Sequence, residues 1–528
     1  MGRTLGVELA HRLRLHGVEQ VFGIPGVHNV ELYRGLETSG LRHVLARHEQ
    51  GVGFMADGYA RATGKPGVGL VISGPGLTNI MTPMGQAYSD RVPLLIISSC
   101  LDETQARRGQ LHQMRDQCGA AATVCAWSAE AKTPRAALRL VDRAFAQFAQ
   151  GLSRPIHIQI PISVLAAPAA EIALPEPALH PAALPEGLAG ICARIIAARR
   201  ALFIFGAGAQ GASTLAQKVL AQLGAAAFTT YTGRGVIAAN TPLLFGATLA
   251  RPSAGRVIAS ADLVVAIGTE LAEVDLWRAE LGHTGALIRV DTDPEVLADG
   301  QAGQIALRCD AGAFLGALSA ECESGERGAA GGWCAAEVAQ ARAGWRAELD
   351  AQTQGVVPVV EALRAAMPAR AMIYSDMTQL AYLAKEIWDM ARPGHWHHPC
   401  GFGTLGYALP AAIGGKVARG AAPVVAIAGD YGFQYTVQEL ATLAEIGGSL
   451  PVILWDNAKL KEIEDCMVNA QITPHAVTAL NPDFAALAAA YGLGFEQPET
   501  LAEIGPALAR AFTSDKACII RLTPDISH

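Results

Sequence analysis

The sequence predicts an α/β protein built from three doubly wound parallel-sheet domains. Short apolar runs rich in Val, Ile and Leu alternate with helical patterns, and several of these runs end in Gly, Asp or Asn. Such alternation is typical of βαβ units, whose parallel sheets are buried under helices on both faces. The length of 528 residues agrees with this organisation, because it suits about three domains of ordinary size.

Two breaks in composition divide the chain. The segment 166–187 contains five prolines, which preclude a regular element, and the segment 321–332 is rich in Gly and charge. We therefore expect an N-terminal domain at 1–165, a linker at 166–187, a middle domain at 188–320, a second linker at 321–350 and a C-terminal domain at 351–528.

Composition narrows the class of protein. The chain is 51% hydrophobic and 17% charged, with a net charge of −7, and it has no basic block of the kind that binds nucleic acid. It has no signal peptide and no apolar run long enough to span a bilayer, so we expect no membrane partner and a cytoplasmic location. The ten cysteines form no C-x-x-C pair and are expected to be reduced.

The C-terminal domain contains the most informative pattern. Two apolar strands, PVVAIAGD at 423–430 and LPVILWDN at 450–457, flank a helical stretch and end in polar residues. Asp430 and Asn457 therefore stand at the carboxyl ends of parallel strands, where ligands bind in such sheets. Mg²⁺ takes oxygen ligands from one or two protein groups and from substrate phosphates. The pair predicts a diphosphate-bound Mg²⁺ site, unless the strands simply happen to end in polar residues.

Distant segments supply further parts of such a site. The run RHVLARHEQGVGFMADGYARATGKPGV at 42–68 predicts a strand that ends near Glu49 and then a helix, and ISGPGLTN follows at 72–79. The run GFGTLGYALPAAIGGKVA at 401–418 contains Leu405, which by itself would be a core residue. By itself, Glu49 would be a helix cap or a surface ion-pair partner.

Together these segments resemble the thiamine diphosphate-dependent enzymes, in the branch that contains acetolactate synthase and benzoylformate decarboxylase, over essentially the whole chain. The resemblance implies pyrimidine-binding, middle and diphosphate-binding domains, with thiamine diphosphate and Mg²⁺ as cofactors. It places Glu49 against the aminopyrimidine ring, where a carboxyl paired with a ring nitrogen favours the tautomer that removes the thiazolium proton. It also implies that Leu405 props the cofactor into its bent conformation and that the carbonyl of Gly403 accepts from the pyrimidine amine.

The resemblance extends to the diphosphate end of the cofactor. It implies a metal bound by Asp430, Asn457 and the main-chain carbonyl of Lys459. Glycines beside this site let backbone amides approach phosphate oxygens closely. The further cofactor contacts that it implies are Pro25, Thr378, Gln379, Gly429, Tyr431 and Gly432.

Two positions of the metal motif depart from the family pattern. Tyr431 stands where the family has Gly, and Asp456 stands where it has Asn. Neither change removes an implied metal ligand. Tyr431 would crowd the diphosphate or close the pocket from one side, unless it packs under the loop.

Other departures concern the reacting end of the pocket. The chain has Val27, followed by His28, where pyruvate decarboxylases have an Asp after the Pro-Gly of the first turn, and their paired histidines are represented by His112 and Gln113. A Glu of theirs falls on Ile463. These departures favour the carboligase and lyase side of the family, with His28 and Gln113 as catalytic residues and Val27, His112 and Ile463 near the substrate. The alternative for His28 is a turn residue with satisfied hydrogen bonds.

The segment 459–469, which would cover the substrate end, is unusually acidic. Carboxylates bind guanidinium groups in a bidentate manner, so Glu462, Glu464 and Asp465 are candidates to bind a cationic substrate tail. The alternative is a solvated helix face. The run at 23–60 most resembles family members that decarboxylate 5-guanidino-2-oxopentanoate. We therefore expect decarboxylation of a small-molecule 2-oxo acid, with this guanidino acid as the preferred candidate.

Two alternative functions are kept. A carboligase or lyase of the same family would form a 2-hydroxy ketone instead. A non-catalytic relative would keep the fold alone, but Glu49, Asp430 and Asn457 argue against it. Because relatives hold the two ends of the cofactor with different subunits, the resemblance implies a homodimer at minimum and favours a homotetramer.

The middle domain contains a pattern typical of dinucleotide binding. A G-x-G-x-x-G match at Gly206, Gly208 and Gly211 follows an apolar strand, but no acidic residue follows within about 20 positions to hold a ribose. FAD or ADP is therefore not expected, although related enzymes carry them in this domain. Three histidines elsewhere suggest a metal by their spacing but are expected as pocket wall or surface: His395, His397 and His398.

Overall fold

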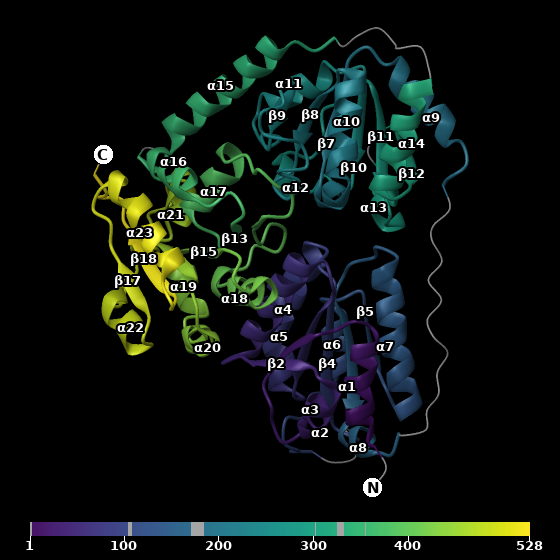
Figure 1. Cartoon of the computed structure of the whole chain (residues 1–528), viewed down its shortest axis with the longest axis vertical. Coiled ribbons are helices and arrows are strands. Elements are labelled where there is room, and N and C mark those ends of the chain that lie inside the picture. The colour runs from purple at the N-terminus through teal and green to yellow at the C-terminus, as the bar shows by residue number, and fades with distance from the viewer. Residues whose placement is uncertain are drawn as a thin grey trace. The chain divides into compact units, whose positions relative to one another are not determined.

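The computed structural model describes residues 3–103, 108–169, 184–300, 303–324, 332–353 and 355–527. These residues form three six-stranded sheets with flanking helices (Figure 1), which confirms the predicted α/β class. Contacts group the chain into two compact units, each described here by itself. Unit 1 takes the described residues of 1–180, 372–378 and 398–527, and unit 2 takes those of 181–371 and 379–397. Within the described ranges, no helix is long and apolar enough to cross a bilayer.

The first sheet of unit 1 is parallel and N-terminal. Its strands run in the order β2 (Arg42–Leu45), β1 (Gln20–Gly23), β3 (Gly67–Val71), β4 (Leu94–Cys100), β6 (Ile156–Pro161) and β5 (Trp127–Glu130). Its helices are α1 (Leu5–Leu15), α2 (Val30–Tyr33), α3 (Leu36–Ser39), α4 (Glu49–Thr63), α5 (Pro75–Ser89), α6 (Gln117–Ala122), α7 (Pro134–Ala149) and α8 (Ile162–Ala166).

Both faces of the first sheet are buried, because alternate side chains of its strands enter different cores. Val71 and Ile96 face the core that contains residues of α4 and α5. Leu70 and Ile97 face the core that contains residues of α1 and α7. Side chains of a strand alternate between the two faces of its sheet, so this two-sided burial confirms the doubly wound arrangement.

The third sheet contributes five parallel strands to unit 1. They run in the order β13 (Met372–Ser375), β15 (Val424–Gly429), β16 (Pro451–Trp455), β18 (Cys518–Leu522) and β17 (Gly494–Glu496). The helices are α18 (Ala408–Arg419), α19 (Asp430–Tyr435), α20 (Glu439–Ile446), α21 (Lys461–Asn469), α22 (Phe484–Ala490) and α23 (Leu501–Thr513). Gly429 pairs with Trp455 in the register of β15 and β16, so Asp430 and Asp456 are the first residues beyond two neighbouring strands.

Two glycines allow α4 and α18 to approach backbone to backbone. A Cβ on Gly58 of α4 would lie 2.0 Å from the carbonyl oxygen of Ala411, and a Cβ on Gly414 of α18 would lie 1.9 Å from that of Met55. No larger residue fits at such a separation. The N-terminal and C-terminal sheets therefore share one apolar core, to which both helices contribute.

Unit 2 contains the second sheet, which is also parallel. Its strands run in the order β12 (Gln304–Arg308), β11 (Ala286–Asp291), β10 (Leu263–Ile267), β7 (Ala201–Phe205), β8 (Ala226–Thr229) and β9 (Leu244–Gly246). The other elements of unit 2 are α9 (Leu188–Ala197), the 3₁₀ helix η1 (Ala207–Ala212), α10 (Ser213–Leu223), α11 (Ala254–Ala259), α12 (Glu273–Leu276), α13 (Pro294–Ala298), α14 (Ala311–Ser324), α15 (Ala335–Gln352), α16 (Val356–Ala366), α17 (Gln379–Ile387) and β14 (Trp396–His397).

The second expected linker contains helical residues. Where 321–350 is described, it holds the end of α14 and most of α15, and Trp345 of α15 is buried on the second sheet beside Phe228 and Phe245. Burial of this tryptophan explains why a segment that reads as a break in composition is helical. Most of the other expected linker, at 170–183, lies outside the described residues.

Candidate functional site

Glu49 lies at the start of α4, just after β2. His48 caps this helix, since its Nδ1 accepts from the backbone N–H of Gln50 at 3.0 Å. The Glu49 carboxylate is half-buried and accepts from Asn79 Nδ2 of α5 at 2.9 Å. Burial raises the pKa of the nearby Tyr33 hydroxyl, and the charge of Glu49 adds to this effect. The carboxyl group is therefore held beside neutral polar groups in a partly desolvated place.

The turn between β3 and α5 connects Glu49 to the predicted substrate residues. A Cβ on Gly76 would lie 3.6 Å from Glu49 Oε1, and a Cβ on Gly74 would lie 2.4 Å from the carbonyl oxygen of His112. Ser73 Oγ lies 2.6 Å from His28 Nδ1. We call this group, Glu49, Asn79, Ser73, His28 and His112, the Glu49 cluster.

The two histidines of the Glu49 cluster are in contact. The rings of His28 and His112 pack edge to face with centroids 4.9 Å apart. Burial lowers the pKa of His28, and the neighbouring His112 lowers it further. Nδ1 of His112 is buried and has no hydrogen-bond partner among the described residues. His28 is therefore hydrogen-bonded through Nδ1 to Ser73 and also packs against a second imidazole ring.

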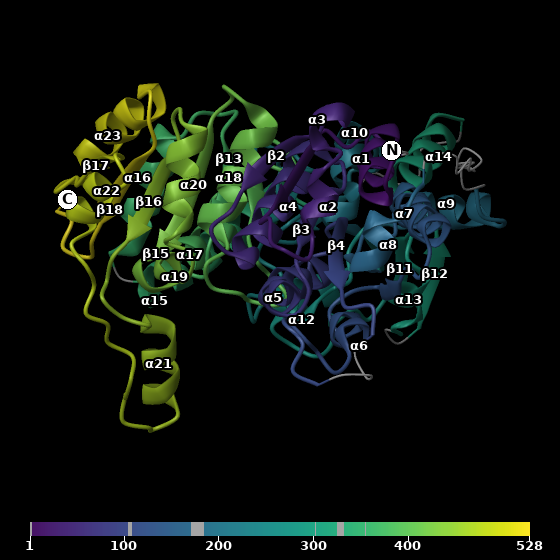
Figure 2. The same ribbon diagram turned by 90° about the horizontal axis from the view of Figure 1, so that it is seen from below.

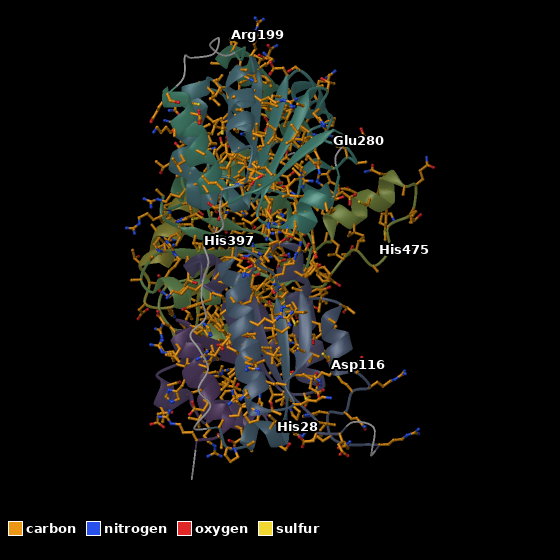
Figure 3. All side chains as sticks on the ribbon, turned by 90° about the vertical axis from the view of Figure 1, so that its right-hand side faces the viewer. His28, Asp116, Arg199, Glu280, His397 and His475 are labelled. Atoms are coloured by element: carbon orange, nitrogen blue, oxygen red, sulfur yellow. The ribbon has the colours of Figure 1, made fainter. Side chains whose placement is uncertain are left out.

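The other residues predicted near this pair lie on the loops around it. Gln113 Oε1 accepts from the backbone N–H of Gln110 at 3.3 Å. Pro25 is exposed, and the Val27 side chain is 68% exposed. His28 is labelled in Figure 3, in the N-terminal part of the chain. Within this chain, therefore, Val27 is available to a ligand or to another subunit.

A buried polar network supports the turn that holds His28. Ser73 donates its N–H to Ser99 Oγ at 3.0 Å, and Gly74 donates its N–H to Gln117 Oε1 at 2.8 Å. Gln117 in turn donates to Ser98 Oγ at 3.1 Å, which lies 2.8 Å from His157 Nε2. Burial lowers the pKa of His157 to about 3, so this histidine is neutral at pH 7. Its role is to orient hydroxyl groups beneath the turn.

Asp430 is the centre of a second cluster, at the carboxyl ends of β15 and β16. Its Oδ2 accepts from Asn481 Nδ2 at 2.6 Å, and the same nitrogen donates to Asp456 Oδ1 at 2.7 Å. The backbone N–H groups of Tyr431 and Ala458 also donate to the Asp430 carboxylate. Burial raises the pKa of Asp430, and the nearby Asp456 acts in the same direction.

The residues that follow Asp456 form a tight turn. Ala458 has a φ of 54°, in the left-handed region, and Asn457 Oδ1 accepts from the N–H of Lys459 at 3.1 Å. Asp456 is paired with Arg521 of β18, whose Nη2 lies 2.6 Å from Asp456 Oδ2. We call Asp430, Asp456, Asn457, Asn481 and Arg521 the Asp430 cluster.

Most of the predicted diphosphate contacts lie around the start of α19. A Cβ on Gly429 would lie 3.2 Å from Thr378 Oγ1, and a Cβ on Gly432 would lie 3.4 Å from Leu405 Cδ2. The structure thus brings Thr378 and Leu405 to the two glycines of the motif. Gln379 is the first residue of α17, and Tyr431 is half-buried with its ring 5.9 Å from that of Tyr435.

Asp376, which was not predicted, holds the loop that carries Gly403 and Leu405. Its buried carboxylate accepts from the N–H of Gly406 at 2.8 Å and from the N–H groups of Tyr407 and Ala408, which open α18. Burial raises the pKa of Asp376 to about 6, against the effect of these donors. The carboxylate acts as a remote cap for the start of α18.

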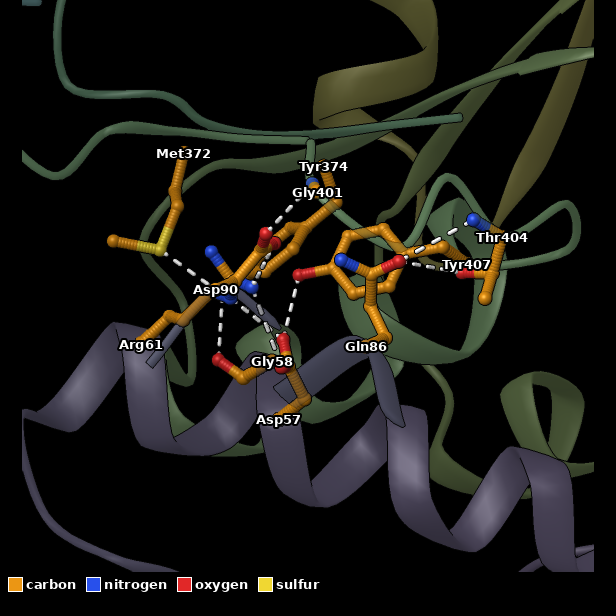
Figure 4. Close-up of polar contacts among 10 residues, drawn as sticks. All are labelled: Asp57, Gly58, Arg61, Gln86, Asp90, Met372, Tyr374, Gly401, Thr404 and Tyr407. Carbon is orange, nitrogen blue, oxygen red and sulfur yellow. Dashed lines mark hydrogen bonds and ion pairs between the residues drawn. The ribbon is translucent and has the colours of Figure 1, made fainter. Parts of the chain in front are cut away.

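The same loop is also fastened to α5, as Figure 4 shows. Gln86 Oε1 accepts from Thr404 Oγ1 at 3.0 Å, and Asp90 Oδ1 accepts from the N–H of Gly401 at 3.1 Å. Because α5 begins at the turn of the Glu49 cluster, one helix supports both the Gly403 loop and that turn.

Buried charged side chains also join α4 and α5 to the start of α18. Arg61 of α4 donates to Asp57 at 2.7 Å and to Asp90 at 2.8 Å, and the Tyr407 hydroxyl donates to Asp57 at 2.7 Å (Figure 4). These side chains are largely or fully buried. Removing one partner would leave an uncompensated buried charge, which is strongly destabilising.

The acidic residues predicted at the substrate end lie on α21. Lys459 Nζ lies 2.8 Å from Glu464 Oε1, and Lys461 pairs with Asp465. Both acids therefore already have cationic partners. Glu462 is exposed and forms no ion pair within the described residues, and Ile463 is 47% exposed. Glu462 is the acid of this segment best able to meet a cationic ligand.

The glycine pattern of the middle domain has a packing explanation. A Cβ on Gly206 would lie 2.2 Å from the carbonyl oxygen of Gly268, and a Cβ on Gly208 would lie 2.7 Å from its Cα. Gly208 also donates its N–H to the Gly268 carbonyl at 3.0 Å. These two glycines permit close approach of the loops after β7 and β10, whether or not a nucleotide binds.

The three histidines near 395–398 do not gather around one point for a metal. His398 Nδ1 lies 3.0 Å from Ser375 Oγ, and His395 Nδ1 lies 3.2 Å from the carbonyl oxygen of Ala371. In the part of the chain that the structure describes, no group of three or more His, Cys, Asp or Glu residues is arranged to hold a metal ion.

Comparison with known proteins identifies related sequences along most of the chain. Three family models match: "Thiamine pyrophosphate enzyme, N-terminal TPP binding domain" at residues 3–120, the central domain at 188–318 and the C-terminal TPP binding domain at 376–522. The "Probable 2-ketoarginine decarboxylase" of Pseudomonas aeruginosa is 44% identical, over 98% of this chain and 94% of that protein.

Acetolactate synthases are more distant relatives. The large subunit of isozyme 2 from Escherichia coli is 28% identical over 98% of this chain and 95% of its own length. The large subunit from Haemophilus influenzae is 28% identical over 100% of this chain and 96% of its own length. The matches therefore span the elements that carry both the Glu49 cluster and the Asp430 cluster.

Proposed function

This chain belongs to the thiamine pyrophosphate enzyme family, and we propose that it decarboxylates a 2-oxo acid with thiamine diphosphate and Mg²⁺. The preferred substrate is 5-guanidino-2-oxopentanoate. The observation that carries this proposal is the near full-length identity of 44% to a protein named for decarboxylation of 2-ketoarginine, which is the same compound. The presence of both candidate clusters supports an active enzyme over a non-catalytic relative.

The residues of the Asp430 cluster fit a Mg²⁺ ion. Mg²⁺ prefers oxygen ligands and usually combines one or two protein groups with phosphate oxygens and water. Asp430 offers a carboxylate, and the tight turn at Ala458 offers the Asn457 side-chain oxygen and the Lys459 carbonyl. Thr378, which follows β13, lies beside Gly429 at the end of the neighbouring strand β15, where both would contact the diphosphate.

The cofactor, when bound, supplies the electron sink that makes loss of carbon dioxide possible. Glu49 would hold the aminopyrimidine ring and favour its proton-abstracting tautomer. His28 is neutral at pH 7 because its pKa is lowered, so it can accept a proton and return it near the reacting carbon. Gln113 would orient the substrate carboxylate or carbonyl beside this imidazole pair.

The guanidinium end of the substrate requires an anionic partner. Glu462 is exposed on α21 and suits this role, while Glu464 and Asp465 are held by lysines of the same segment. A carboxylate recognises a guanidinium through paired, charge-assisted hydrogen bonds. Exposed Val27 and Ile463 would contact the methylene chain of the substrate.

We propose that the smallest active form is a homodimer, in which each active site takes the Glu49 cluster from one subunit and the Asp430 cluster from the other. Glu49 is bonded to Asn79 within the first sheet region, and Asp430 is bonded to Asn481 within the third. If each active site joins the Glu49 cluster of one subunit to the Asp430 cluster of another, two inactive variants can complement each other. Random mixing of Glu49→Gln and Asp430→Asn subunits should then restore about a quarter of the sites, whereas sites within single chains would restore none.

A carboligase is the second candidate, favoured by the full-length acetolactate synthase relatives. The test is a panel of 2-oxo acids supplied with and without an acceptor aldehyde. Carbon dioxide and the simple aldehyde as main products support the decarboxylase, and a 2-hydroxy ketone as the main product overturns it. The sequence also predicts that the protein is a homotetramer and that it is located in the cytoplasm, and both statements stay predictions.

A further inference from the structure

Between β16 and α22 the chain leaves the third sheet and returns to it. This excursion, defined as residues 458–480, carries α21 and stands apart from β15, β16 and β18 in Figure 2. His475 on its return leg is labelled in Figure 3. No side chain of α21 is buried, and Val468 and Ile472 are both 56% exposed. Apart from Val477 on the return leg, which is buried, little apolar packing therefore holds the excursion in place within this chain.

Hydrogen bonds at its base hold the two legs of the excursion together. Ala479 donates its N–H to the carbonyl of Ala458 at 3.0 Å, and Leu460 donates its N–H to the carbonyl of Val477 at 2.8 Å. An antiparallel bridge joins Lys459 and Thr478 between them. The orientation of the excursion thus depends on how this short ladder is attached to the sheet.

Asn481, the first residue after the excursion, makes that attachment. Its Nδ2 donates to Asp430 Oδ2 at 2.6 Å and to Asp456 Oδ1 at 2.7 Å. Its Oδ1 accepts from Gln434 Nε2 at 3.1 Å, and this nitrogen also donates to the Asp430 carbonyl at 3.0 Å. Both hydrogens and the oxygen of one carboxamide are therefore used to join the ends of two strands and α19.

The other leg reaches the same carboxylate, since the N–H of Ala458 donates to Asp430. The first residue of the excursion, Ala458, and the residue that follows it, Asn481, are thus both hydrogen-bonded to the carboxylate that would bind the metal. Hydrogen bonds to a charged acceptor are shorter and stronger than neutral ones. A change in the position of Asp430 on binding its ligands would be passed directly to the base of the ladder.

We propose that Asn481 is a positioning residue that couples the metal site to the excursion, an inference that rests on the proposed role of Asp430 as a metal ligand. Asn481 holds Asp430 in the direction that its metal requires, and it ties the base of α21 to that carboxylate. Occupation of the metal site fixes the excursion, which then presents Glu462 to the substrate. Loss of the carboxamide weakens cofactor binding and releases α21 together.

The experiment compares the full-length wild type with Asn481→Ala and with Asn469→Ala, an exposed asparagine at the end of α21. Calorimetry measures the Kd of thiamine diphosphate with Mg²⁺ present, and trypsin cleavage after Lys461 reports exposure of the excursion. Loss of two charge-assisted hydrogen bonds should raise the Kd of Asn481→Ala at least about tenfold. The cofactor and Mg²⁺ should slow cleavage in the wild type and in Asn469→Ala, but not in Asn481→Ala.

The outcomes separate the coupling from the proposed function. A wild type that binds no thiamine diphosphate with Mg²⁺ overturns the proposed function itself. A wild type that binds it, with Asn481→Ala unchanged in Kd or still protected from trypsin, overturns the coupling alone. Gln434→Ala removes the hydrogen bond that Asn481 Oδ1 accepts, without removing a hydrogen bond to either carboxylate. It should raise the Kd of the cofactor and reduce the protection from trypsin, as Asn481→Ala does. It therefore tests the coupling even where Asn481→Ala folds poorly.

Discussion

Arg521 Nη2 lies 2.6 Å from Oδ2 of Asp456, the position at which the sequence resemblance implies an asparagine in the family. Asp456 is buried at the end of β16, while Arg521 of β18 reaches it from the neighbouring strand with its side chain 32% exposed. The guanidinium therefore offsets the added negative charge close to the proposed metal ligand Asp430. Asp456, the residue that departs from the family motif, is therefore paired with an arginine of the same sheet.

Replacing Arg521 by Gln should weaken cofactor binding. The Asp456 carboxylate would be left buried without its cationic partner, near the place of the diphosphate, and this should raise the Kd of thiamine diphosphate with Mg²⁺ by about tenfold, on the order of 1.4 kcal/mol. The double variant with Asp456→Asn should recover most of the affinity. Calorimetric titration of both variants measures the coupling between the two residues.

Arg510→Gln is the matched control for Arg521→Gln. Arg510 also pairs with a carboxylate of the C-terminal sheet, Glu496 at 2.8 Å, but its side chain is 60% exposed. Exposed ion pairs contribute about 0–1 kcal/mol, so the control should bind cofactor like the wild type. Equal losses for both arginines would show that the pair with Asp456 has no special role.

Glu49→Gln should abolish turnover while cofactor binding is largely kept. The amide retains the shape and a hydrogen bond with Asn79, but it cannot favour the proton-abstracting tautomer, so a fall in kcat of about 100-fold or more is expected. Glu37→Gln, an exposed acid of the same domain, serves as the control. Full activity of Glu49→Gln would remove Glu49 from the reaction.

The pH profile of kcat/KM should report the protonation of His28 in the imidazole pair. Burial and His112 lower the pKa of His28, so His28 is neutral above this lowered pKa and protonated below it. If neutral His28 accepts a proton, kcat/KM falls as the pH drops through a midpoint below about 6.5. His28→Asn should lose this acid limb together with most of the activity. An unchanged limb in the variant would assign it to another group.

Asp376 should give stability a distinct pH dependence. Its pKa is about 6 in the folded chain, above the ordinary aspartate value, so the folded state binds the proton more tightly. Protonation of Asp376 contributes roughly 3 kcal/mol to the free energy of unfolding. This contribution is fully present below about pH 4 and is lost as the pH rises to about 6. Urea unfolding should be measured at pH 4.5 and pH 7 for the wild type and for Asp376→Asn, whose side chain does not titrate. The free energy of unfolding of the variant should rise relative to that of the wild type between the two pH values. Parallel curves would contradict this.

Much of the fold followed from patterns within short segments. The apolar runs before Asp430 and Asp456 are the strands β15 and β16, and Glu49 begins a helix directly after a strand, as predicted. The site residues carried by motifs were likewise found at strand ends and helix starts. These features are local, because the period of the hydrophobic pattern determines the element and the first polar residue marks its end.

The residues that support the site were missed because their partners are distant in sequence. Asn481 is far from Asp430 in the chain, Arg521 comes from another strand, and no short motif marks either one. Asn79 ends the quoted segment 72–79, and Asp376 lies two positions before Thr378, but nothing in their own identity shows what they contact. Most of α15 lies within the expected linker 321–350, because its composition does not reveal that Trp345 is buried.

Steady-state release of carbon dioxide from 5-guanidino-2-oxopentanoate, with and without thiamine diphosphate and Mg²⁺, tests the central claim most directly. The account predicts turnover only when both are present, and a kcat/KM for this substrate at least about tenfold above that for pyruvate, with Glu462→Gln removing the preference. Release from pyruvate at equal efficiency, or a condensed 2-hydroxy ketone as the main product, would contradict it.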